Sequence, residues 1–307
     1  MKKIIVVVGA TGNLGGKIVN ALLTNGAEVR AIVRLATSAD KINKLEQSGV
    51  MVFQVDMLSK AEISTCCIGA HCVVSALAGL SETIIDAQKI VLDAAVAAKV
   101  KRFIPSDYSS DFTNLVTGEN RNLDLRRVFH EYLDKAPIKA TSIFNGPFMD
   151  LLTTDMPLIL SKRHRILCWG NPDQIIEFTT TFNVAEFTAK AAMDDETPRY
   201  LRIAGDRLSC NDFVKLMSEI DEAKYQLFRP GGIGLLNIVI KLTKFFSPSK
   251  NELYPVWQGM QYMRDMMEGR IIFQTYDNER YKNIKWTSVK DFLLENHQIE
   301  KANAPDT

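Results

Sequence analysis

The chain of 307 residues contains few potential metal ligands or disulfide partners. It has only four histidines and five cysteines, and no His/Cys spacing resembles that of a metal site. We therefore expect no bound metal. The number of cysteines is odd and there is no Cys-x-x-Cys pair, which argues against a disulfide framework. Such cysteine usage favours a reducing compartment, and we expect a cytoplasmic protein.

Long hydrophobic runs and an excess of either charge are also missing. A membrane-spanning helix needs roughly 20 apolar residues, whereas the run at residues 233–240 is interrupted by Gly234 and Asn237. The apolar run at residues 4–8 ends at Gly9, short of the roughly 7–15 residues of a signal peptide's apolar region. Lys and Arg number 37, against 36 Asp and Glu. We therefore expect no membrane contact and no nucleic-acid contact.

The first 150 residues alternate two kinds of segment. Short apolar runs predict strands at residues 4–8, 28–33, 50–55, 72–76, 102–105 and 140–144. Helical periodicity between them predicts helices at residues 13–25, 41–48, 61–68, 82–98 and 119–134. This alternation is typical of βαβ units, and near-continuous apolar strands indicate a sheet covered on both faces. The pattern predicts an α/β fold with a doubly wound parallel sheet.

The alternation ends after Asn145. Residues 146–175 contain three prolines, and we expect them to be rich in loops. Further elements are expected as helices at 184–193 and 211–220, a short strand at 200–203, and apolar helices within 229–270 that form a lid. Ser209 and Asn211 are the two candidates for the N-cap of the helix at 211–220.

This pattern divides the chain into two parts. Residues 1–150 are expected to form the sheet domain, and residues 176–204 are candidates to complete it. Residues 151–175 and 205–297 are expected to form a smaller C-terminal α/β lobe that serves as a substrate or lid lobe. Residues 298–307 are expected to be a frayed tail.

A glycine-rich loop joins the first strand to the first helix. Gly9, Gly12 and Gly15 give the pattern Gly-x-x-Gly-x-x-Gly in the order strand, loop, helix. Gly9 would allow a tight turn, Gly12 a close approach to a pyrophosphate, and Gly15 close packing of helix on sheet. Free N–H groups at the helix N-terminus favour phosphate. The alternative, an ordinary glycine turn, does not require this order, so we expect a Rossmann-type dinucleotide site.

Arg34 bears on the choice of dinucleotide. It lies nineteen positions beyond Gly15, at the end of the second predicted strand, where NAD-binding proteins carry an acidic residue. A guanidinium there can hold a 2′-phosphate through two hydrogen bonds. Alternatively, Arg34 only ends the strand in solvent. The nearby charged side chains Arg30, Lys41 and Lys44 are also positive, and we expect NADP rather than NAD.

Several stretches together resemble one known group, the atypical short-chain dehydrogenases of the NmrA-like and isoflavone-reductase-like families. They are Gly-Ala-Thr-Gly-Asn-Leu-Gly (9–15), Val-Arg-Ala-Ile-Val-Arg (29–34), Val-Asp (55–56), Val-Val-Ser-Ala-Leu-Ala-Gly (73–79), Lys-Arg-Phe-Ile-Pro-Ser-Asp-Tyr (101–108) and Asn-Glu-Arg-Tyr (278–281). The segment 101–108 is the most specific of these. The resemblance covers most of the chain, and it is weaker from 150 to 270.

The resemblance implies a Rossmann core, NADP(H) binding and a small C-terminal lobe. The cofactor contacts that we expect with it are Gly9, Thr11, Gly12, Asn13, Leu14, Gly15, Arg34, Asp56, Ala76, Leu77, Ser106 and Asn145.

The catalytic residue of that group is missing from this chain. Reductases of the group use a lysine on the helix after the fifth strand, but residues 119–134 contain no lysine. Alignment without gaps from Thr141 puts Arg126 at its position, whereas alignment on the pair Arg126-Arg127 puts Asn122 there. Arginine cannot release its proton near neutral pH, although it can stabilise an oxyanion. The Tyr-x-x-x-Lys pair of typical short-chain dehydrogenases is absent too.

Three side chains are therefore candidates for catalysis: Arg126, Tyr108 and His130. Tyr108 follows the fifth strand and can donate a hydrogen bond to a carbonyl, or else only packs against cofactor or lid. His130 lies one turn after Arg126 and can titrate near neutral pH, or else is a half-exposed helix residue.

A cluster of methionine and aromatic residues on a predicted helix has two equally supported interpretations: it lines an apolar pocket, or it packs as core. Its members are Trp257, Met260, Tyr262, Met263, Met266 and Met267.

These features favour an NADPH-dependent reductase of a small apolar or aromatic carbonyl or enone, as a monomer or homodimer. Hydride transfer would come from the cofactor, and the protein would orient the reactants. The alternative is a non-catalytic NADP(H)-binding sensor of the NmrA type that acts on a regulatory protein partner. A sugar-nucleotide epimerase or dehydratase is disfavoured because the Tyr-x-x-x-Lys pair is missing.

Overall fold

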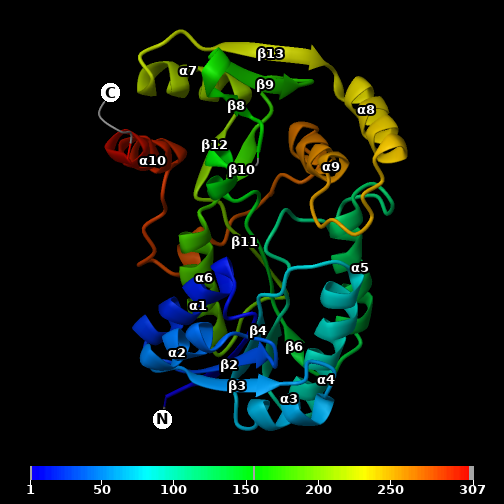
Figure 1. Ribbon diagram of the computed structural model, residues 1–307, viewed down its shortest axis with the longest axis vertical. Coiled ribbons are helices and arrows are strands. Elements are labelled where there is room, and N and C mark those ends of the chain that lie inside the picture. Colours follow the sequence, from blue (N-terminus) through cyan, green and yellow to red (C-terminus); the bar gives the residue numbers. More distant parts are fainter. Residues whose placement is uncertain (1, 155, 304–307) are drawn as a thin grey trace.

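The structure, a computed structural model, describes residues 2–154 and 156–303. A six-stranded sheet forms one half of the molecule, drawn in the lower part of Figure 1, with the strand order β3-β2-β1-β4-β5-β6. All its pairings are parallel. The strands are β1 (Ile4–Val8), β2 (Glu28–Arg34), β3 (Met51–Val55), β4 (Cys72–Ser75), β5 (Arg102–Ile104) and β6 (Lys139–Ala140). This order is that of the Rossmann fold and confirms the doubly wound sheet predicted from the alternation.

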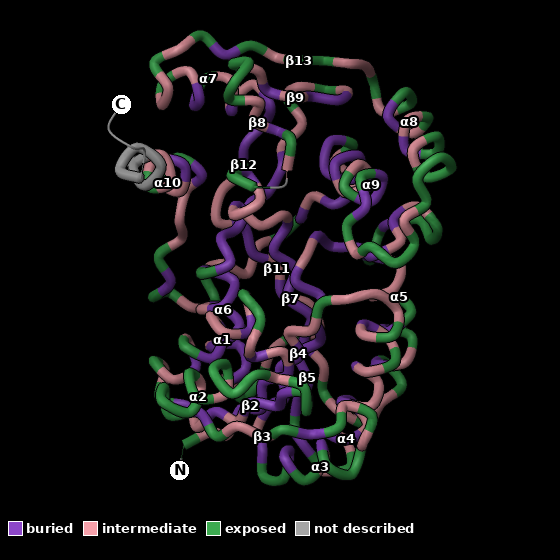
Figure 2. The backbone as a smooth tube through the Cα atoms, viewed as in Figure 1, coloured by how far each residue is buried: buried purple, intermediate pink, exposed green. Residues whose placement is uncertain are grey.

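Helices cover both faces of the sheet. The helices that connect its strands are α1 (Asn13–Thr24), α2 (Ala39–Gln47), α3 (Lys60–Cys67), the π-helix η1 (Glu82–Ala87), α4 (Gln88–Ala97) and α5 (Arg121–Leu133). One core lies between the sheet and α1 together with the later helix α6 (Thr181–Met193). The other lies between the sheet and α3, α4 and α5. The inner strands β1, β2, β4 and β5 are accordingly buried along most of their length, whereas the edge strands β3 and β6 are more exposed (Figure 2).

The second half of the chain adds small sheets and helices. Its remaining elements are β7 (Ser142–Phe144), η2 (Met149–Thr153), β8 (Ile159–Leu160), η3 (Ser161–Arg163), β9 (Arg165–Trp169), β10 (Ile176–Phe178), β11 (Tyr200–Arg202), β12 (Asp206–Leu208), α7 (Cys210–Ile220), β13 (Gln226–Gly231), α8 (Ile233–Phe246), α9 (Val256–Met267), η4 (Asn278–Arg280) and α10 (Val289–Asn303). The order β13-β9-β8 forms one sheet, and β10-β12 and β11-β7 form two pairs. A third core fills this lobe.

Two expectations from the sequence were wrong in detail. The strand expected at 140–144 is divided into β6 and β7, because the chain changes partner at Thr141, whose N–H donates to Phe103 while that of Ser142 donates to Arg199. The loop-rich region 146–175 contains β8 and β9. Of the tail expected at 298–307, residues up to Asn303 belong to α10 and the rest lie outside the described range, so the frayed tail stays a prediction. The helix N-cap is Ser209, which forms a capping box with Asp212.

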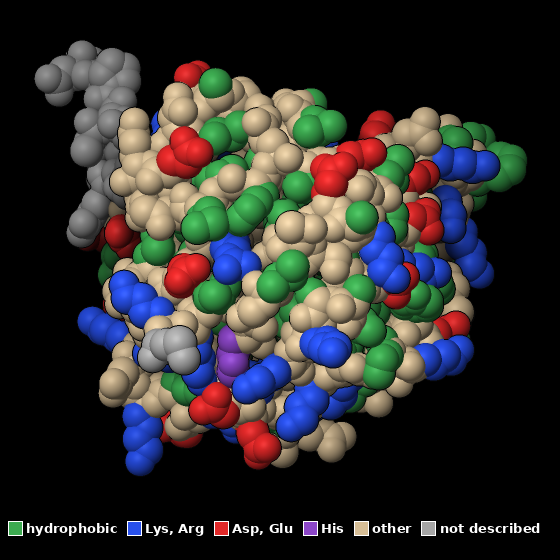
Figure 3. Space-filling model, turned by 90° about the horizontal axis from the view of Figure 1, so that it is seen from below, with side chains coloured by type: hydrophobic (Ala, Val, Ile, Leu, Met, Phe, Trp, Pro, Cys, Tyr) green, Lys and Arg blue, Asp and Glu red, His purple; other side chains and the backbone are tan. Residues whose placement is uncertain are grey.

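Charged side chains of both signs are spread over the face shown in Figure 3, with hydrophobic ones between them. Among the described residues, no helix is long and apolar enough to cross a membrane. In the same residues, no group of three or more His, Cys, Asp or Glu side chains is arranged to hold a metal ion.

The loop between β1 and α1 is packed too closely for side chains. Gly9 has a φ of +89°, and a Cβ there would lie 2.5 Å from the carbonyl oxygen of Ala76, just beyond β4. A Cβ on Gly15 would lie 2.1 Å from the carbonyl oxygen of Gly9. Because both obstacles are backbone atoms, neither can move aside. The first turn of α1 is thereby held against the ends of β1 and β4.

Gly15→Ala is expected to lower the free energy of unfolding by about 1–3 kcal/mol, the usual cost of overpacking. Gly16→Ala is the matched control, because a Cβ there meets only Ala10, at 3.5 Å. That control should be neutral or slightly stabilising, since alanine is the better helix former. Urea unfolding followed by circular dichroism measures both. Equal stabilities of the two variants would contradict the packing argument.

Candidate active site

The glycine loop lies where the strand order reverses, between β1 and β4, which is where open α/β sheets bind ligands. Gly12 is the N-cap of α1, has no side chain to accept hydrogen bonds, and no acidic residue follows in the first turn. Within the described chain, a Cβ on Gly12 would have one close neighbour, the Gly9 oxygen at 3.3 Å. Gly12 and Asn13 are exposed, whereas Thr11 and Leu14 are half-buried. The helix start is thus open to an anion.

The end of β2 presents a cation beside this loop. Arg34 is exposed, and its guanidinium makes no hydrogen bond or ion pair with any described residue. Arg30 differs, because its Nη1 donates to the carbonyl oxygens of Cys66 and Ile68 at 3.0 and 2.8 Å. Asp56, after β3, accepts from the N–H of Leu58 and turns the chain there. Of the two arginines on β2, Arg34 is therefore the one available to a ligand.

The ends of β4 and β5 meet α5 at the same edge of the sheet. The hydroxyl of Ser106 donates to the carbonyl oxygen of Leu77, the neighbour of Ala76, at 2.5 Å. Arg126 Nε donates to the carbonyl oxygen of Ser106 at 3.2 Å. Asn145, after β7, is fully buried, and its Oδ1 accepts no hydrogen bond from the described residues. Leu77, Ser106 and Asn145, from three segments of the chain, thus lie at one edge of the sheet. Arg126 contacts this edge through Ser106.

The two possible positions of the missing lysine lie on one side of α5. Arg126 Nη1 donates to the carbonyl oxygen of Asn122 at 2.9 Å, one helical turn earlier. Asn122 is buried, and its amide donates to the carbonyl oxygen of Leu253 at 2.9 Å while its Oδ1 accepts from Arg121. Both positions are therefore occupied by side chains that already serve as hydrogen-bond partners within the protein.

Helix α9 is joined to the first turn of α5 through buried polar groups. Asn120, the N-cap of α5, donates to the Asp265 carboxylate at 2.7 Å and accepts from Gln258 at 2.8 Å. Arg121 lies over the ring of Trp257, 4.7 Å from its centroid. Figure 1 shows α9 between the upper lobe and α5. The second lobe is thereby connected to the same end of α5 that carries Asn122.

His130 is buried within a polar network and is not half-exposed, as one interpretation of the sequence had it. Its Nε2 lies 2.7 Å from Asp107 Oδ2, and Arg199 lies 3.3 Å from its Nδ1. Burial by itself raises the pKa of the Asp107 carboxyl, but the attraction of His130, with help from Ser142 and Arg126, brings it below its usual value. The pair joins α5 to the segment after β5. Because both side chains are buried, it positions α5 rather than facing a ligand.

Tyr108 also points inward. It is buried in the core beneath α6, where its hydroxyl is near Thr188. Burial raises the pKa of this hydroxyl. The expectation that Tyr108 donates a hydrogen bond to a substrate carbonyl is therefore not supported by its position, and it acts as a core residue.

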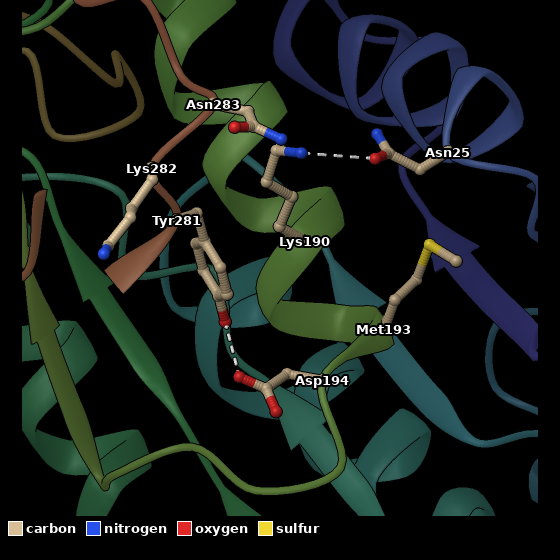
Figure 4. Close-up of a pocket in the computed structure, with 7 residues that line it drawn as sticks. All are labelled: Asn25, Lys190, Met193, Asp194, Tyr281, Lys282 and Asn283. Carbon is tan, nitrogen blue, oxygen red and sulfur yellow. Dashed lines mark hydrogen bonds between the residues drawn. The ribbon is translucent and has the colours of Figure 1, made fainter. Parts of the chain in front are cut away.

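A hollow of about 470 Å³ lies elsewhere, as Figure 4 shows. It is lined by Asn25, Lys190, Met193, Asp194, Tyr281, Lys282 and Asn283. Lys190 reaches Asn25 across it at 3.4 Å, and Tyr281 donates to Asp194 at 2.9 Å. Asn25 caps the C-terminus of α1, the opposite end from the glycine loop. This hollow is therefore separate from the candidate site.

The model of the NmrA-like family matches residues 1–228. Among curated relatives, "Probable pinoresinol-lariciresinol reductase 3" of Arabidopsis thaliana is 25% identical over 233 residues, which are 73% of this chain and 76% of the relative. A crystal structure of isoflavone reductase superimposes with a TM-score of 0.82 at 18% identity, covering 96% of this chain and 100% of that one. A structure of AtPrR2 with NADP+ and (+)pinoresinol gives 0.79 at 18% identity, covering 96% and 99%.

The buried Asp107–His130 pair generates a pH-dependent prediction. The folded-state pKa of Asp107 lies below its ordinary value, so the ionised carboxylate stabilises the folded protein above the unfolded pKa, near 3.9. This stabilisation is lost as the pH falls through the folded-state pKa. Asp107→Asn removes it and is expected to cost about 3–5 kcal/mol at pH 7, as for a broken buried pair. The cost should shrink toward pH 3.

Urea unfolding of wild type and variant at several pH values measures this cost. Asp134→Asn is the matched control, because Asp134 pairs with Arg199 at 2.9 Å but is half exposed. Exposed pairs contribute about 0–1 kcal/mol. A cost for Asp107→Asn that equals the control's, or that does not change with pH, would show that the buried pair is not stabilising.

Proposed function

Because this chain belongs to the NmrA-like family, we propose that it is an NADP(H)-dependent reductase of a small apolar or aromatic carbonyl or enone. The observation that carries the proposal is the open helix N-terminus at the reversal of the strand order, with the free Arg34 beside it. Relatives named as pinoresinol-lariciresinol and isoflavone reductases support a reductase. We further infer a reducing compartment such as the cytoplasm, because all five cysteines are buried and unpaired.

The residues present suit an NADP(H) molecule. The backbone N–H groups of Asn13 and Leu14 would hold the pyrophosphate, because that of Gly12 already donates to Gly9, and Arg34 would hold the 2′-phosphate. The edge formed by Ala76, Leu77 and Ser106 would receive the nicotinamide, with Asn145 next to it. Gly9 and Gly15 would shape the loop, Thr11 and Asn13 would flank the phosphates, and Asp56 would lie at the adenosine side. When bound, NADPH supplies a hydride.

The substrate would lie between this edge and α9. In the methionine and aromatic cluster of α9, Trp257, Met263, Met266 and Met267 are buried, whereas Met260 and Tyr262 are only half-buried. The first group acts as core, whereas the second packs against that core with part of its surface exposed, and a ligand would contact this part. An apolar or aromatic substrate suits such a surface. In this arrangement residues 1–150 with 176–204 bind the cofactor, and residues 151–175 and 205–297 cover the substrate.

The alternative function, an NADP(H) sensor without turnover, is favoured by one observation. The side of α5 where relatives place a catalytic lysine offers Asn122 and Arg126, and neither can serve as an acid or base near neutral pH. In a sensor, cofactor binding would change the position of the second lobe for a partner protein. The two functions differ in one measurable respect, the oxidation of NADPH.

Single-turnover oxidation of NADPH is therefore the decisive experiment. We expect wild-type protein mixed with NADPH and a panel of aromatic enones, quinones and aldehydes to lose nicotinamide absorbance with at least one of them. Gly12→Val is the control, because its side chain would occupy the place of the pyrophosphate, so it should show no oxidation. Binding of NADPH without oxidation of any substrate would favour the sensor.

Arg34→Ala should remove most of the preference for NADPH over NADH. A charge-assisted hydrogen-bond pair to phosphate contributes about 1.5–3 kcal/mol, which corresponds to roughly 10–100-fold in affinity. Isothermal titration calorimetry with both cofactors measures the preference. Lys215→Ala, which removes an exposed cation on α7 in the other lobe, is the control and should keep it. Wild-type protein that binds both cofactors equally would refute this assignment.

A further inference from the structure

The proposed reduction lacks a proton donor on α5, and α9 brings a different side chain to that place. Gln261, Tyr262 and Asp265 lie three, four and seven positions after Gln258, so all four residues share one face of α9. Three of them contact the start of α5: Gln258 and Asp265 bind Asn120, and Gln261 accepts from the backbone N–H of Arg121 at 3.3 Å. The fourth, Tyr262, is therefore held on the same side.

Tyr262 lies beside both positions of the missing lysine. Burial raises the pKa of its hydroxyl to about 12, and the nearby charge of Arg126 and the neighbouring Asn122 side chain oppose this effect. Arg126 is in turn bound to Ser106 at the edge proposed for the nicotinamide. A phenol, a guanidinium and a carboxamide thus form one cluster between α5 and α9.

We propose that Tyr262 is the proton donor of the reduction and that Arg126 supplies the positive charge that the family's lysine would otherwise provide. This proposal rests on the proposed function. In this pair the phenol would donate the proton and the neighbouring guanidinium would stabilise the phenolate. The two groups come from different lobes, so proton donation would require α9 to lie against α5. The other candidates cannot take this role, because Tyr108 and His130 are turned into the protein.

For a carbonyl substrate, bound NADPH would supply the hydride: a C–H bond of the cofactor would break, its electron pair would form the new C–H bond at the carbonyl carbon, and the cofactor would be oxidised to NADP+. The π electrons of the C=O bond would move to the oxygen. The O–H bond of Tyr262 breaks, and its proton bonds to that oxygen to give the alcohol. An alkoxide is a stronger base than a phenolate, so the transfer is favourable even from a phenol with a raised pKa. Arg126 stabilises the phenolate until water returns a proton to it.

Tyr262→Phe tests the donor and keeps the aromatic ring. With the best substrate of the panel, we expect kcat to fall by about 10²–10⁴-fold, the usual contribution of general acid catalysis. KM and the affinity for NADPH should change little, because the hydroxyl acts in the transition state. Tyr132→Phe is the matched control: Tyr132 is on α5, but its hydroxyl bonds Asp93 on α4, so kcat should stay unchanged. Circular dichroism checks that both variants fold.

A second measurement needs neither cofactor nor turnover. Protein labelled with ¹³C at tyrosine Cζ is titrated with alkali, and the Tyr262 signal is identified as the one missing from Tyr262→Phe. Arg126→Gln should move the titration of that signal to higher pH, because it removes the nearby positive charge. Tyrosines far from Arg126 provide the internal control in the same spectra.

The outcomes separate the two proposals. A wild-type protein that turns over while Tyr262→Phe keeps full kcat would overturn the donor assignment and leave the reductase intact. A wild-type protein that binds NADPH but reduces no substrate would overturn the reductase, and the donor with it. An unchanged titration in Arg126→Gln would overturn the role of Arg126 alone. Loss of kcat in Tyr262→Phe together with a shifted titration would support the full proposal.

Discussion

The close approach of backbone to backbone at the start of α1 is the constraint on which the rest of the site depends. Gly15 lies against the carbonyl of Gly9, and Gly9 lies against Ala76 beyond β4, with no space for a side chain at either contact. The first N–H groups of α1 are therefore held at the point where the strand order reverses. Because the start of α1 would set the positions of both the pyrophosphate and the nicotinamide, a shift of α1 would move the whole candidate site.

Helix α5 connects the sheet to the second lobe and fixes their relative position. Its inner side is held to the sheet by His130 and Asp107, and its first turn is held to α9 by Asn120 and Asp265. Both attachments are buried and polar, so each has a strict geometry and is costly to break. The result is that the cluster of Arg126, Asn122 and Tyr262 occupies one place although its members belong to different parts of the chain.

Under the proposed function, this arrangement would allow a chain without the family's lysine to carry out the reduction. Two needs have to be met at the edge of the sheet: positive charge near a developing oxyanion and a proton for it. Lysine meets both with one side chain. Here the charge would come from Arg126 and the proton from Tyr262, and dividing the roles makes turnover depend on contact between the lobes. The sensor function would depend on the same contact between the lobes. In a regulator, binding of the cofactor would change the position of the second lobe.

The sequence by itself determined the features that are encoded locally. The order of strand, glycine loop and helix, the alternation that predicts the parallel sheet, the position of Arg34 at the end of the second strand and the lack of lysine on α5 can all be read from short segments, because periodicity and glycine positions act over a few residues. Only the tertiary structure decided which side chains meet. His130 pairs with Asp107, Tyr108 is buried in the core, and Tyr262 lies near Arg126. These neighbours come together because segments distant in the sequence pack against one another, and a local sequence pattern does not predict such packing.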